Sequence, residues 1–361
     1  MRILWDFRLF SYGYRDRGVG VFVRGMARAI MDGGLQAEIY IWGNREHVPA
    51  ELAGYAARWI PYETGTWKSD LFTIPLIIIR HRIRVFHYWV AMGPIFRIGM
   101  GLIHPCATCV TIHDLGVEHV RDRDFLDHVR RTNYWRFQKM LLTKANVIVC
   151  NSQKTRGEVL AFAKAKIHRC DVIYMPVAPR PPHGGSAQNR TERTRMRTFV
   201  TLGGAPHKNV PKVVQAFSIF AESHPGYCLV VLGNVAADDI PGLKPAAVFF
   251  EGMDRYVYYL DNAAGIIACS TYEGLGIPAL EAMSRGCPLV ASDMPVYHET
   301  CGGEGAARFV DPHEPSSIAE GMGDVAGHQD EWTKKSEQGC ARYKRMSESA
   351  GKQWAELYNS L

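Results

Sequence analysis

A repeated alternation of short apolar runs with longer amphipathic stretches limits most strongly how this chain can fold. Several runs hold four or more consecutive apolar residues, which is typical of strands buried on both faces of a parallel sheet. In the first half the predicted strands are residues 2–5, 37–42, 85–88, 109–112, 147–150 and 172–174. Helices are predicted between them, for example at residues 19–31 and 124–143. The pattern predicts an α/β fold with a doubly wound parallel sheet.

The alternation stops at Pro179, where PRPPHGGSAQNRTERTRMR is rich in Pro, Gly and polar residues, and then resumes. We interpret residues 181–197 as a linker. The strands predicted after it are residues 198–202, 228–232, 248–250, 265–269, 288–291 and 308–310. A chain of 361 residues exceeds what one hydrophobic core usually serves. We therefore expect a Rossmann-like domain at 1–180 and a second at 198–345, with ligands beyond the carboxyl ends of the strands.

Composition indicates the class of protein and its expected location in the cell. An apolar content of 47% with 22% charged residues excludes a disordered chain. The longest apolar run, residues 71–79, is too short to cross a bilayer, and the N-terminus lacks the apolar core of a signal peptide. Nine cysteines without a framework spacing indicate free thiols, and the CxxC pair Cys106 and Cys109 lies in a predicted strand that would separate the two thiols. These features predict a cytoplasmic protein.

The charge is divided unevenly, with a net +11 in residues 1–180 and −5 in residues 181–361. Such asymmetry indicates an anionic partner. The basic run at 190–197 has no interleaved aromatic residues, so we expect a solvated linker rather than a nucleic-acid site. The segment 121–144 has an apolar face that we assign to the core, namely Leu126, Val129, Phe137, Met140 and Leu141. Peripheral contact with an anionic membrane, through Trp135 and the cations Arg130, Arg131, Arg136 and Lys139, stays open.

Residues 270–291, STYEGLGIPALEAMSRGCPLVA, carry the most specific chemistry. Glu273 lies in a loop after a strand, Pro278 is expected to open a helix, and Glu281 follows in the first turn. The backbone amides before the helix lack intrahelical partners: those of Leu275, Gly276 and Ile277. Such amides attract phosphate, whereas carboxylates accept hydrogen bonds from hydroxyl groups. Phosphate beside a polyol describes a sugar nucleotide.

This segment resembles the E-x7-E signature of retaining glycosyltransferases of the GT-B fold, family 4. The resemblance covers essentially the whole chain, most strongly residues 198–320. It implies two Rossmann-like domains facing a central cleft, with a final helix near 349–359 within the last segment, 346–361, crossing back to the first domain. It also implies that Glu273 contacts the transferred sugar and that Glu281 holds the ribose hydroxyls.

Other motifs extend the resemblance to the first domain. The turn FSYGYRDRGVGVFVRGM has Gly18 and Gly20, which permit close approach of the backbone before the helix. It is similar to the family's GIGRYV segment, which implies that these glycines lie near the donor diphosphate. In TIHDL, His113 corresponds to a histidine that touches the transferred sugar. His87, in VFHYW, has a similar position at a strand end and is a second candidate.

The remaining contacts with the sugar nucleotide are expected from the second domain. LGGAPHKNVPKVVQAF resembles the family's RKN turn, which implies that Lys208 binds the diphosphate and stabilises its growing charge. The usual arginine is His207 here, and the turn is one residue short, so full neutralisation of the diphosphate stays open. Gly252 and Met253, after the strand VFFEG, are expected to line the nucleobase.

Asp122-Arg123-Asp124 matches the DxD pattern of metal-dependent glycosyltransferases, but we interpret these residues as a helix start, where acidic residues are favoured. Resemblance to the GT-B family implies that no metal or other cofactor is needed.

The resemblance therefore implies a retaining hexosyltransferase acting on a UDP- or GDP-sugar. The acceptor would be a hydroxyl of a glycan or lipid-linked molecule in bacterial surface polysaccharide or glycolipid assembly. Glu273, His113 and Lys208 are the predicted catalytic residues. A sugar-nucleotide epimerase of the same fold and an inactive nucleotide-sugar-binding subunit remain as alternatives.

Overall fold

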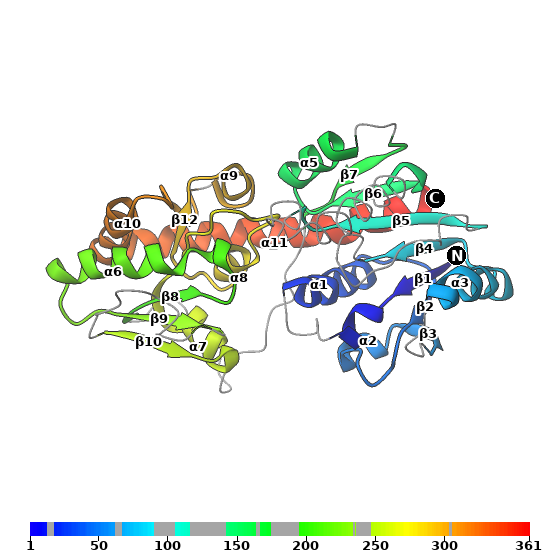
Figure 1. Ribbon diagram of the computed structural model, residues 1–361, viewed down its shortest axis with the longest axis horizontal. Coiled ribbons are helices and arrows are strands. Elements are labelled where there is room, and N and C mark those ends of the chain that lie inside the picture. Colours follow the sequence, from blue (N-terminus) through cyan, green and yellow to red (C-terminus); the bar gives the residue numbers. More distant parts are fainter. Residues whose placement is uncertain are drawn as a thin grey trace, which may run out of the picture. The chain divides into compact units, whose positions relative to one another are not determined.

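The computed structural model describes residues 1–12, 18–61, 67–89, 105–115, 142–163, 167–174, 195–233, 235, 247–302 and 305–361. The chain divides into two compact units (Figure 1). Unit 1 comprises Met1–Ala178 with Met346–Leu361, and unit 2 comprises Pro179–Arg345. Each is an α/β unit with one parallel sheet, which confirms the predicted fold class.

Unit 1 is built on a seven-stranded sheet in the order β3-β2-β1-β4-β5-β6-β7. Its strands are β1 (Arg2–Asp6), β2 (Glu38–Trp42), β3 (Ala56–Ile60), β4 (Val85–Tyr88), β5 (Ala107–Ile112), β6 (Val147–Cys150) and β7 (Cys170–Val172). Its helices with described bounds are η1 (Arg8–Tyr12), α1 (Gly18–Asp32), α2 (Ala50–Ala53), α3 (Trp67–His81), α5 (Gln153–Ala163) and the end of α11 (Gln329–Asn359).

The two edge strands of this sheet differ most from the sequence prediction. The prediction omitted β3, and it placed β7 two residues too late, at 172–174. An edge strand has a neighbour on one side only, so it need not be a continuous apolar run. Accordingly, β3 exposes Arg58 and β7 carries Asp171, and these polar residues mask both strands in the sequence.

The end of α11 packs into the core of unit 1 through Trp354 and Tyr358, which are fully buried. The hydroxyl of Tyr358 accepts a hydrogen bond from Nε1 of Trp5 at 3.1 Å. The same hydroxyl therefore donates its proton to Nδ1 of His87 at 2.6 Å, and Nε2 of His87 donates to Oγ1 of Thr111 at 2.8 Å. Strands β1, β4 and β5 are thus joined to α11 by one buried polar chain.

Helices α1 and α11 also approach each other closely. A Cβ atom added to Gly33 would lie 2.6 Å from the carbonyl carbon of Gly351, and one added to Gly351 would overlap the carbonyl oxygen of Ala29. Glycine at both positions permits this contact between the two backbones.

Unit 2 is built on a six-stranded sheet in the order β10-β9-β8-β11-β12-β13. Its strands are β8 (Met196–Leu202), β9 (Cys228–Leu232), β10 (Val248–Glu251), β11 (Ala263–Ala268), β12 (Leu289–Ser292) and β13 (Arg308–Val310). The helices are η4 (Pro206–Lys208), α6 (Val210–Ser223), η6 (Met253–Arg255), α7 (Tyr256–Asn262), α8 (Ile277–Ser284), α9 (Pro295–Cys301), α10 (Pro315–Gly327) and the start of α11. Its core includes Phe199, Phe217 and Trp332.

Helix α11 is continuous from unit 2 into unit 1. The helix expected at 349–359 is its last part, because α11 begins at Gln329. Trp332 near its start belongs to the core of unit 2, whereas Trp354 near its end is buried in unit 1. No helix in the described ranges is long and apolar enough to span a membrane, and the apolar run 71–79 lies within α3.

Several predictions fall on residues outside the described ranges. These are most of the predicted helix 124–143, Asp122 and Asp124, the side chains around Trp135, and residues 181–194 of the linker.

Candidate active site

Two neighbouring strands of unit 2, β8 and β11, end beside each other and carry the loops predicted to bind the donor. The loop after β8 contains η4 with His207 and Lys208, and the loop after β11 contains Glu273. The backbone amide of Thr271 donates to the carbonyl oxygen of His207 at 2.8 Å, which ties the two loops together. Asn209 ends η4 with φ at 61° and donates from Nδ2 to the carbonyl oxygen of Pro312 at 2.6 Å.

Lys208 and Glu273 form an ion pair, with Nζ and Oε1 2.6 Å apart. Their side chains are only 19% and 11% exposed. Oγ of Ser270 also donates to Oε1 of Glu273, at 2.8 Å, and Oγ of Ser292 donates to the carbonyl oxygen of Ser270 at 2.6 Å. The sequence analysis missed Ser270, whose only signal is its place where the strand passes into the loop.

This arrangement leaves bonding capacity for a ligand. An ammonium group has three donors, so Lys208 keeps two N–H groups besides the one directed at Glu273. Within the described part of the chain, Oε2 of Glu273 accepts no side-chain hydrogen bond. The Lys208–Glu273 corner, meaning these two side chains, can therefore offer hydrogen-bond donors to an anion and an acceptor to a hydroxyl group.

The start of α8 provides further donors. Gly276 has φ at 81°, and a Cβ atom there would overlap the ring of Tyr297, so a side chain is excluded at this position. The amides of Leu275, Gly276 and Ile277 donate no hydrogen bond to any other described residue. Three partnerless N–H groups at a helix start form a favourable environment for phosphate.

Glu281 lies deeper in α8 than predicted. The helix begins at Ile277, with Pro278 as its second residue, so Glu281 is the fifth residue and belongs to the second turn. The expectation of a first-turn carboxylate was wrong, because proline is tolerated anywhere in the first turn, where amides have no intrahelical partner. The Glu281 side chain is buried, at 4% exposure.

Gly252 and Met253 follow the carboxyl end of β10, and the Met253 side chain is 39% exposed. Strand β9 lies between β10 and β8. Gly252 and Met253 therefore lie at the carboxyl end of the sheet, as Lys208 does, but one strand away from the Lys208–Glu273 pair.

In unit 1, His113 follows the carboxyl end of β5 and donates from Nε2 to the carbonyl oxygen of Trp89 at 2.8 Å. Burial lowers the pKa of His113, which favours the neutral ring with its proton on Nε2. The ring of Phe22 on α1 packs edge-on against it, with centroids 4.2 Å apart. Among the described residues Nδ1 has no partner, so it can accept a hydrogen bond from a hydroxyl group.

The structure corrects two further expectations in unit 1. Gly18 and Gly20 lie within the first turn of α1 and not before it. His87 is not at a ligand-accessible strand end: it is fully buried, both ring nitrogens are hydrogen-bonded, and burial lowers its pKa well below the ordinary value. Trp89 stacks on one side of the His87 ring, and Trp354 and Tyr358 of α11 also pack against it. The strand pattern around His87 cannot reveal the contacts from α11.

Two family models together match most of the chain. Residues 193–345 match the family model of Glycosyl transferases group 1, and residues 17–180 match that of Glycosyltransferase Family 4. The O-antigen chain mannosyltransferase RfbU of Salmonella typhimurium is 22% identical over 285 residues, which is 74% of this chain and 75% of that protein. The O-antigen chain mannosyltransferase B of Escherichia coli is 30% identical over 125 residues, 32% of each chain.

Solved structures share the fold over their full length. HepE of Anabaena, in complex with UDP and glucose, superposes with a TM-score of 0.73 at 15% identity and covers 100% of both chains. WaaG, a glycosyltransferase involved in lipopolysaccharide biosynthesis, gives a TM-score of 0.67 at 14% identity over 99% of both chains. The parallel sheets of both units and the two family matches lead to one conclusion. The chain belongs to the family 4 glycosyltransferases of the GT-B fold.

Proposed function

We propose that this glycosyltransferase moves a hexose from a nucleoside diphosphate sugar to a hydroxyl group of a glycan or lipid-linked acceptor, with retention of the anomeric configuration and without a metal ion. The observation that carries the proposal is the Lys208–Glu273 ion pair beside the amides of residues 275–277, which have no hydrogen-bond partner in the part of the chain that the structure describes. It combines cationic and neutral donors for a diphosphate with a carboxylate for a sugar.

The donor diphosphate is assigned to Lys208 and the amides at the start of α8. Charge-assisted hydrogen bonds from Lys208 become stronger as the bond between sugar and phosphate breaks, because negative charge then grows on the leaving phosphate. Pairing with Lys208 also reduces the repulsion between Glu273 and the diphosphate, which would otherwise oppose donor binding. His207, from the same turn, is placed near the diphosphate in this proposal.

The transferred sugar is assigned to Oε2 of Glu273 and to Nδ1 of His113, and the ribose hydroxyls to Glu281. In the proposed step, the acceptor oxygen bonds to the anomeric carbon on the face from which the diphosphate departs. The acceptor proton passes to an oxygen of the leaving phosphate. Glu273 would stabilise the positive charge that develops on the sugar, and it would not form a bond to it.

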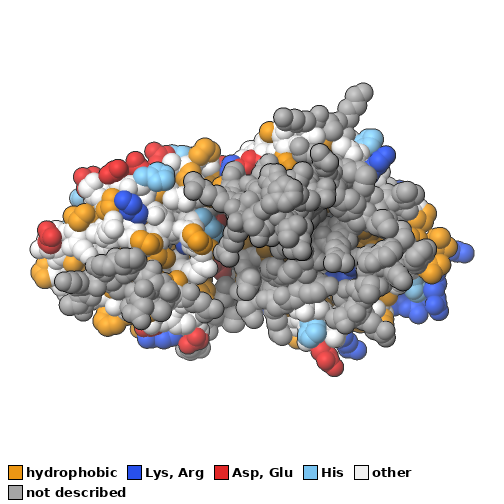
Figure 2. Space-filling model, viewed as in Figure 1, with side chains coloured by type: hydrophobic (Ala, Val, Ile, Leu, Met, Phe, Trp, Pro, Cys, Tyr) orange, Lys and Arg blue, Asp and Glu red, His pale blue; other side chains and the backbone are white. Residues whose placement is uncertain are grey.

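The acceptor class is proposed from the relatives, two of which are named for O-antigen chain synthesis. We further propose that unit 1 contacts an anionic membrane. On α3, Leu76 and Ile79 are 65% and 64% exposed, and Arg80, Arg82 and Arg84 follow them in sequence. In Figure 2, hydrophobic side chains edged by Lys and Arg gather on the part of unit 1 that carries α3 in Figure 1.

Donor binding and transfer test the catalytic proposal. Thermal unfolding is measured with UDP, GDP, ADP and TDP and their sugars in EDTA, because a ligand that binds only the native state raises Tm. The best donor is then incubated with candidate acceptors, and the anomeric configuration of the product is read by proton NMR. An inverted product, or a rise in Tm and activity only after Mg²⁺ or Mn²⁺ is added, contradicts the proposal.

Vesicle flotation tests the membrane proposal separately. Recovery with anionic vesicles should exceed recovery with neutral ones and should decline as salt rises. Leu76→Ser combined with Ile79→Ser should reduce recovery. Leu160→Ser on α5, where the wild-type side chain is 41% exposed, is the matched control and should not. Equal recovery with neutral and anionic vesicles contradicts the membrane proposal and leaves the catalytic one intact.

A further inference from the structure

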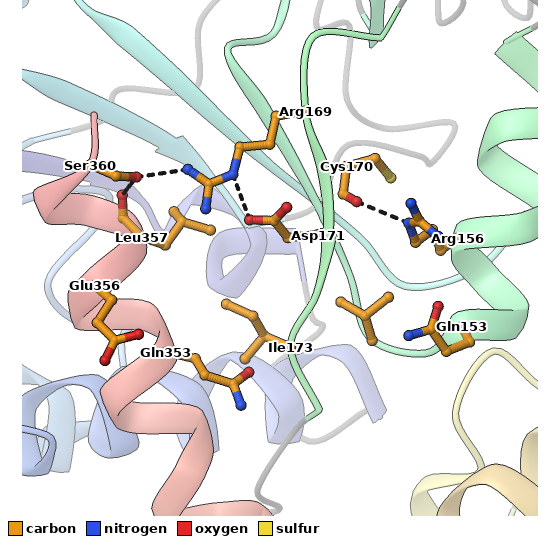
Figure 3. Close-up of a pocket in the computed structure, with 11 residues that line it drawn as sticks. Gln153, Arg156, Arg169, Cys170, Asp171, Ile173, Gln353, Glu356, Leu357 and Ser360 are labelled. Atoms are coloured by element: carbon orange, nitrogen blue, oxygen red, sulfur yellow. Dashed lines mark hydrogen bonds and ion pairs between the residues drawn. The ribbon is translucent and has the colours of Figure 1, made fainter.

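Unit 1 contains a pocket of about 560 Å³ that has no part in the candidate active site. Figure 3 shows its walls: α5 on one side, the last turns of α11 on the other, and β7 between them. Its polar lining includes Arg156, Arg169, Cys170, Asp171 and Ser360. Its volume lies within the range of small-molecule sites, roughly 300–1,000 Å³.

One lining residue, Cys170, has a second thiol next to it. The sulfur atoms of Cys150 on β6 and Cys170 on β7 are 3.8 Å apart. In the sheet register, however, Cys150 lies opposite Val172 and Cys170 lies opposite Ile148, so the two cysteines are diagonal neighbours. Neighbouring strands are roughly 4.8 Å apart and two residues span roughly 6.6 Å along a parallel strand, so the two Cα atoms are roughly 8 Å apart, beyond the usual Cα separation of a disulfide. The pair is therefore suited to sharing a proton and poorly suited to forming a bond between its own sulfurs.

The charges around the two thiols differ. Arg156 donates from Nε to the carbonyl oxygen of Cys170 at 2.9 Å and holds its guanidinium beside the Cys170 thiol. The hydrogen bond shared with Cys150 and the nearby Arg156 lower the pKa of Cys170, although burial and the Asp171 carboxylate act to raise it. The same hydrogen bond and burial raise the pKa of Cys150. The guanidinium of Arg156 and the lower burial of Cys170 thus favour the thiolate at Cys170 over Cys150.

The second arginine of the pocket is already neutralised. Arg169 pairs with Asp171 at 2.7 Å and donates to Oγ of Ser360 at 2.7 Å, as Figure 3 shows. The Arg156 guanidinium faces both the carbonyl oxygen and the thiol of Cys170. A guanidinium has five N–H donors, so Arg156 keeps donors for an anionic group inside the pocket. A carboxylate matches a guanidinium in geometry as well as charge.

From this geometry we propose that Cys170 is a site of reversible covalent modification, at which a small carboxylate-bearing disulfide transfers one of its thiol halves to the Cys170 sulfur. In this step the Cys170 thiolate attacks one sulfur of the reagent. The S–S bond of the reagent breaks, a new S–S bond to Cys170 forms, and the other half leaves as a thiolate. Excess small thiol reverses the exchange, and the pocket holds the attached half with its carboxylate near Arg156.

The test uses 5,5′-dithiobis(2-nitrobenzoate), a disulfide with one carboxylate on each ring, on the folded full-length protein. The released aryl thiolate is followed by absorbance, and the modified cysteine is mapped by mass spectrometry at partial reaction. One thiol should react in a fast phase that maps to Cys170 and disappears in Cys170→Ser. Cys106 is an internal comparison, because burial raises its pKa to about 12.

Two further variants test whether Arg156, and not simple exposure of the thiol, makes Cys170 react fast. Arg156→Gln should slow the fast phase by about threefold for each unit that the thiol pKa rises, since the thiolate fraction falls while its nucleophilicity increases. Arg58→Gln is the control, because Arg58 is exposed on β3 at the opposite edge of the same sheet, and it should leave the rate unchanged. Mapping of the fast phase to another cysteine, or equal rates in wild type and Arg156→Gln, overturns the proposal. A loss of 2 Da that joins Cys150 to Cys170 also overturns it.

Discussion

The Tyr358→Phe variant tests how the last helix is held in unit 1. The hydroxyl of Tyr358 is the acceptor for Nε1 of Trp5 and the donor to Nδ1 of His87, and all three side chains are fully buried. Removing the oxygen leaves one donor and one acceptor without partners and changes the packing very little. Each orphaned buried group costs about 1–3 kcal/mol, so for two groups we expect the free energy of unfolding to fall by about 2–6 kcal/mol.

Urea unfolding followed by tryptophan fluorescence measures this loss. Seven of the eight tryptophans belong to unit 1, and only Trp332 belongs to unit 2, so the signal reports chiefly on the unit that contains Tyr358. The urea midpoint should fall while the slope stays constant, because the surface exposed on unfolding is unchanged.

Tyr40→Phe is the matched control in the same unit. Tyr40 is also buried, at 6% exposure, but its hydroxyl has only a 3.5 Å contact with Glu38. Its removal should cost less than about 0.5 kcal/mol, because a contact of that length contributes little. A Tyr358→Phe protein as stable as the Tyr40→Phe protein would refute the argument that the buried polar chain secures α11.

Three further predictions follow from the same geometry. Gly351→Ala should destabilise unit 1, because the added methyl group would meet the Ala29 carbonyl. Gly157→Ala is the control: its methyl group would meet no described atom within 4 Å, so it should be neutral or stabilising by about 0.5–1 kcal/mol. The urea midpoints of the two variants are compared. Burial lowers the pKa of His87 well below 6.5, so below that pH the unfolded chain binds more protons and stability falls with falling pH, by at most about 1.4 kcal/mol per pH unit for this residue. His87→Gln should flatten this decline between pH 7 and pH 5, and parallel profiles would argue against it. Glu273→Gln should lower kcat by about 100-fold with little change in nucleotide affinity, and near wild-type turnover would remove Glu273 from the proposed step.

Central strands of both sheets could be predicted closely because they are apolar on both faces. Residues 147–150 and 228–232 became β6 and β9 without any shift in their bounds. A strand at the edge of a sheet is covered on fewer sides and can carry polar residues. In unit 1, β3 and β7 do so, and these residues hide the apolar pattern of a strand. Local periodicity therefore finds an edge strand only where that strand is mostly apolar, as in β10 and β13 of unit 2, which were predicted to within one residue.

The candidate site shows the same division between local and distant information. The placement of Lys208 and Glu273 in loops at strand ends follows from the chain around each residue. Their ion pair could not be predicted, because it depends on β8 and β11 being neighbours although two strands separate them in sequence. His87 was misjudged for a related reason: its partner Tyr358 is 271 residues away.

Calorimetric titration of nucleoside diphosphate tests the central claim, that the Lys208–Glu273 corner holds the donor. UDP and GDP are titrated in EDTA into wild type, Lys208→Gln and Lys212→Gln, the last being a control lysine on α6 of the same unit. We predict that at least one nucleotide binds, and that Lys208→Gln weakens it by about 10- to 100-fold, as the loss of hydrogen bonds from a charged group requires. Lys212→Gln should bind like wild type. Equal affinity in wild type and Lys208→Gln would contradict the account.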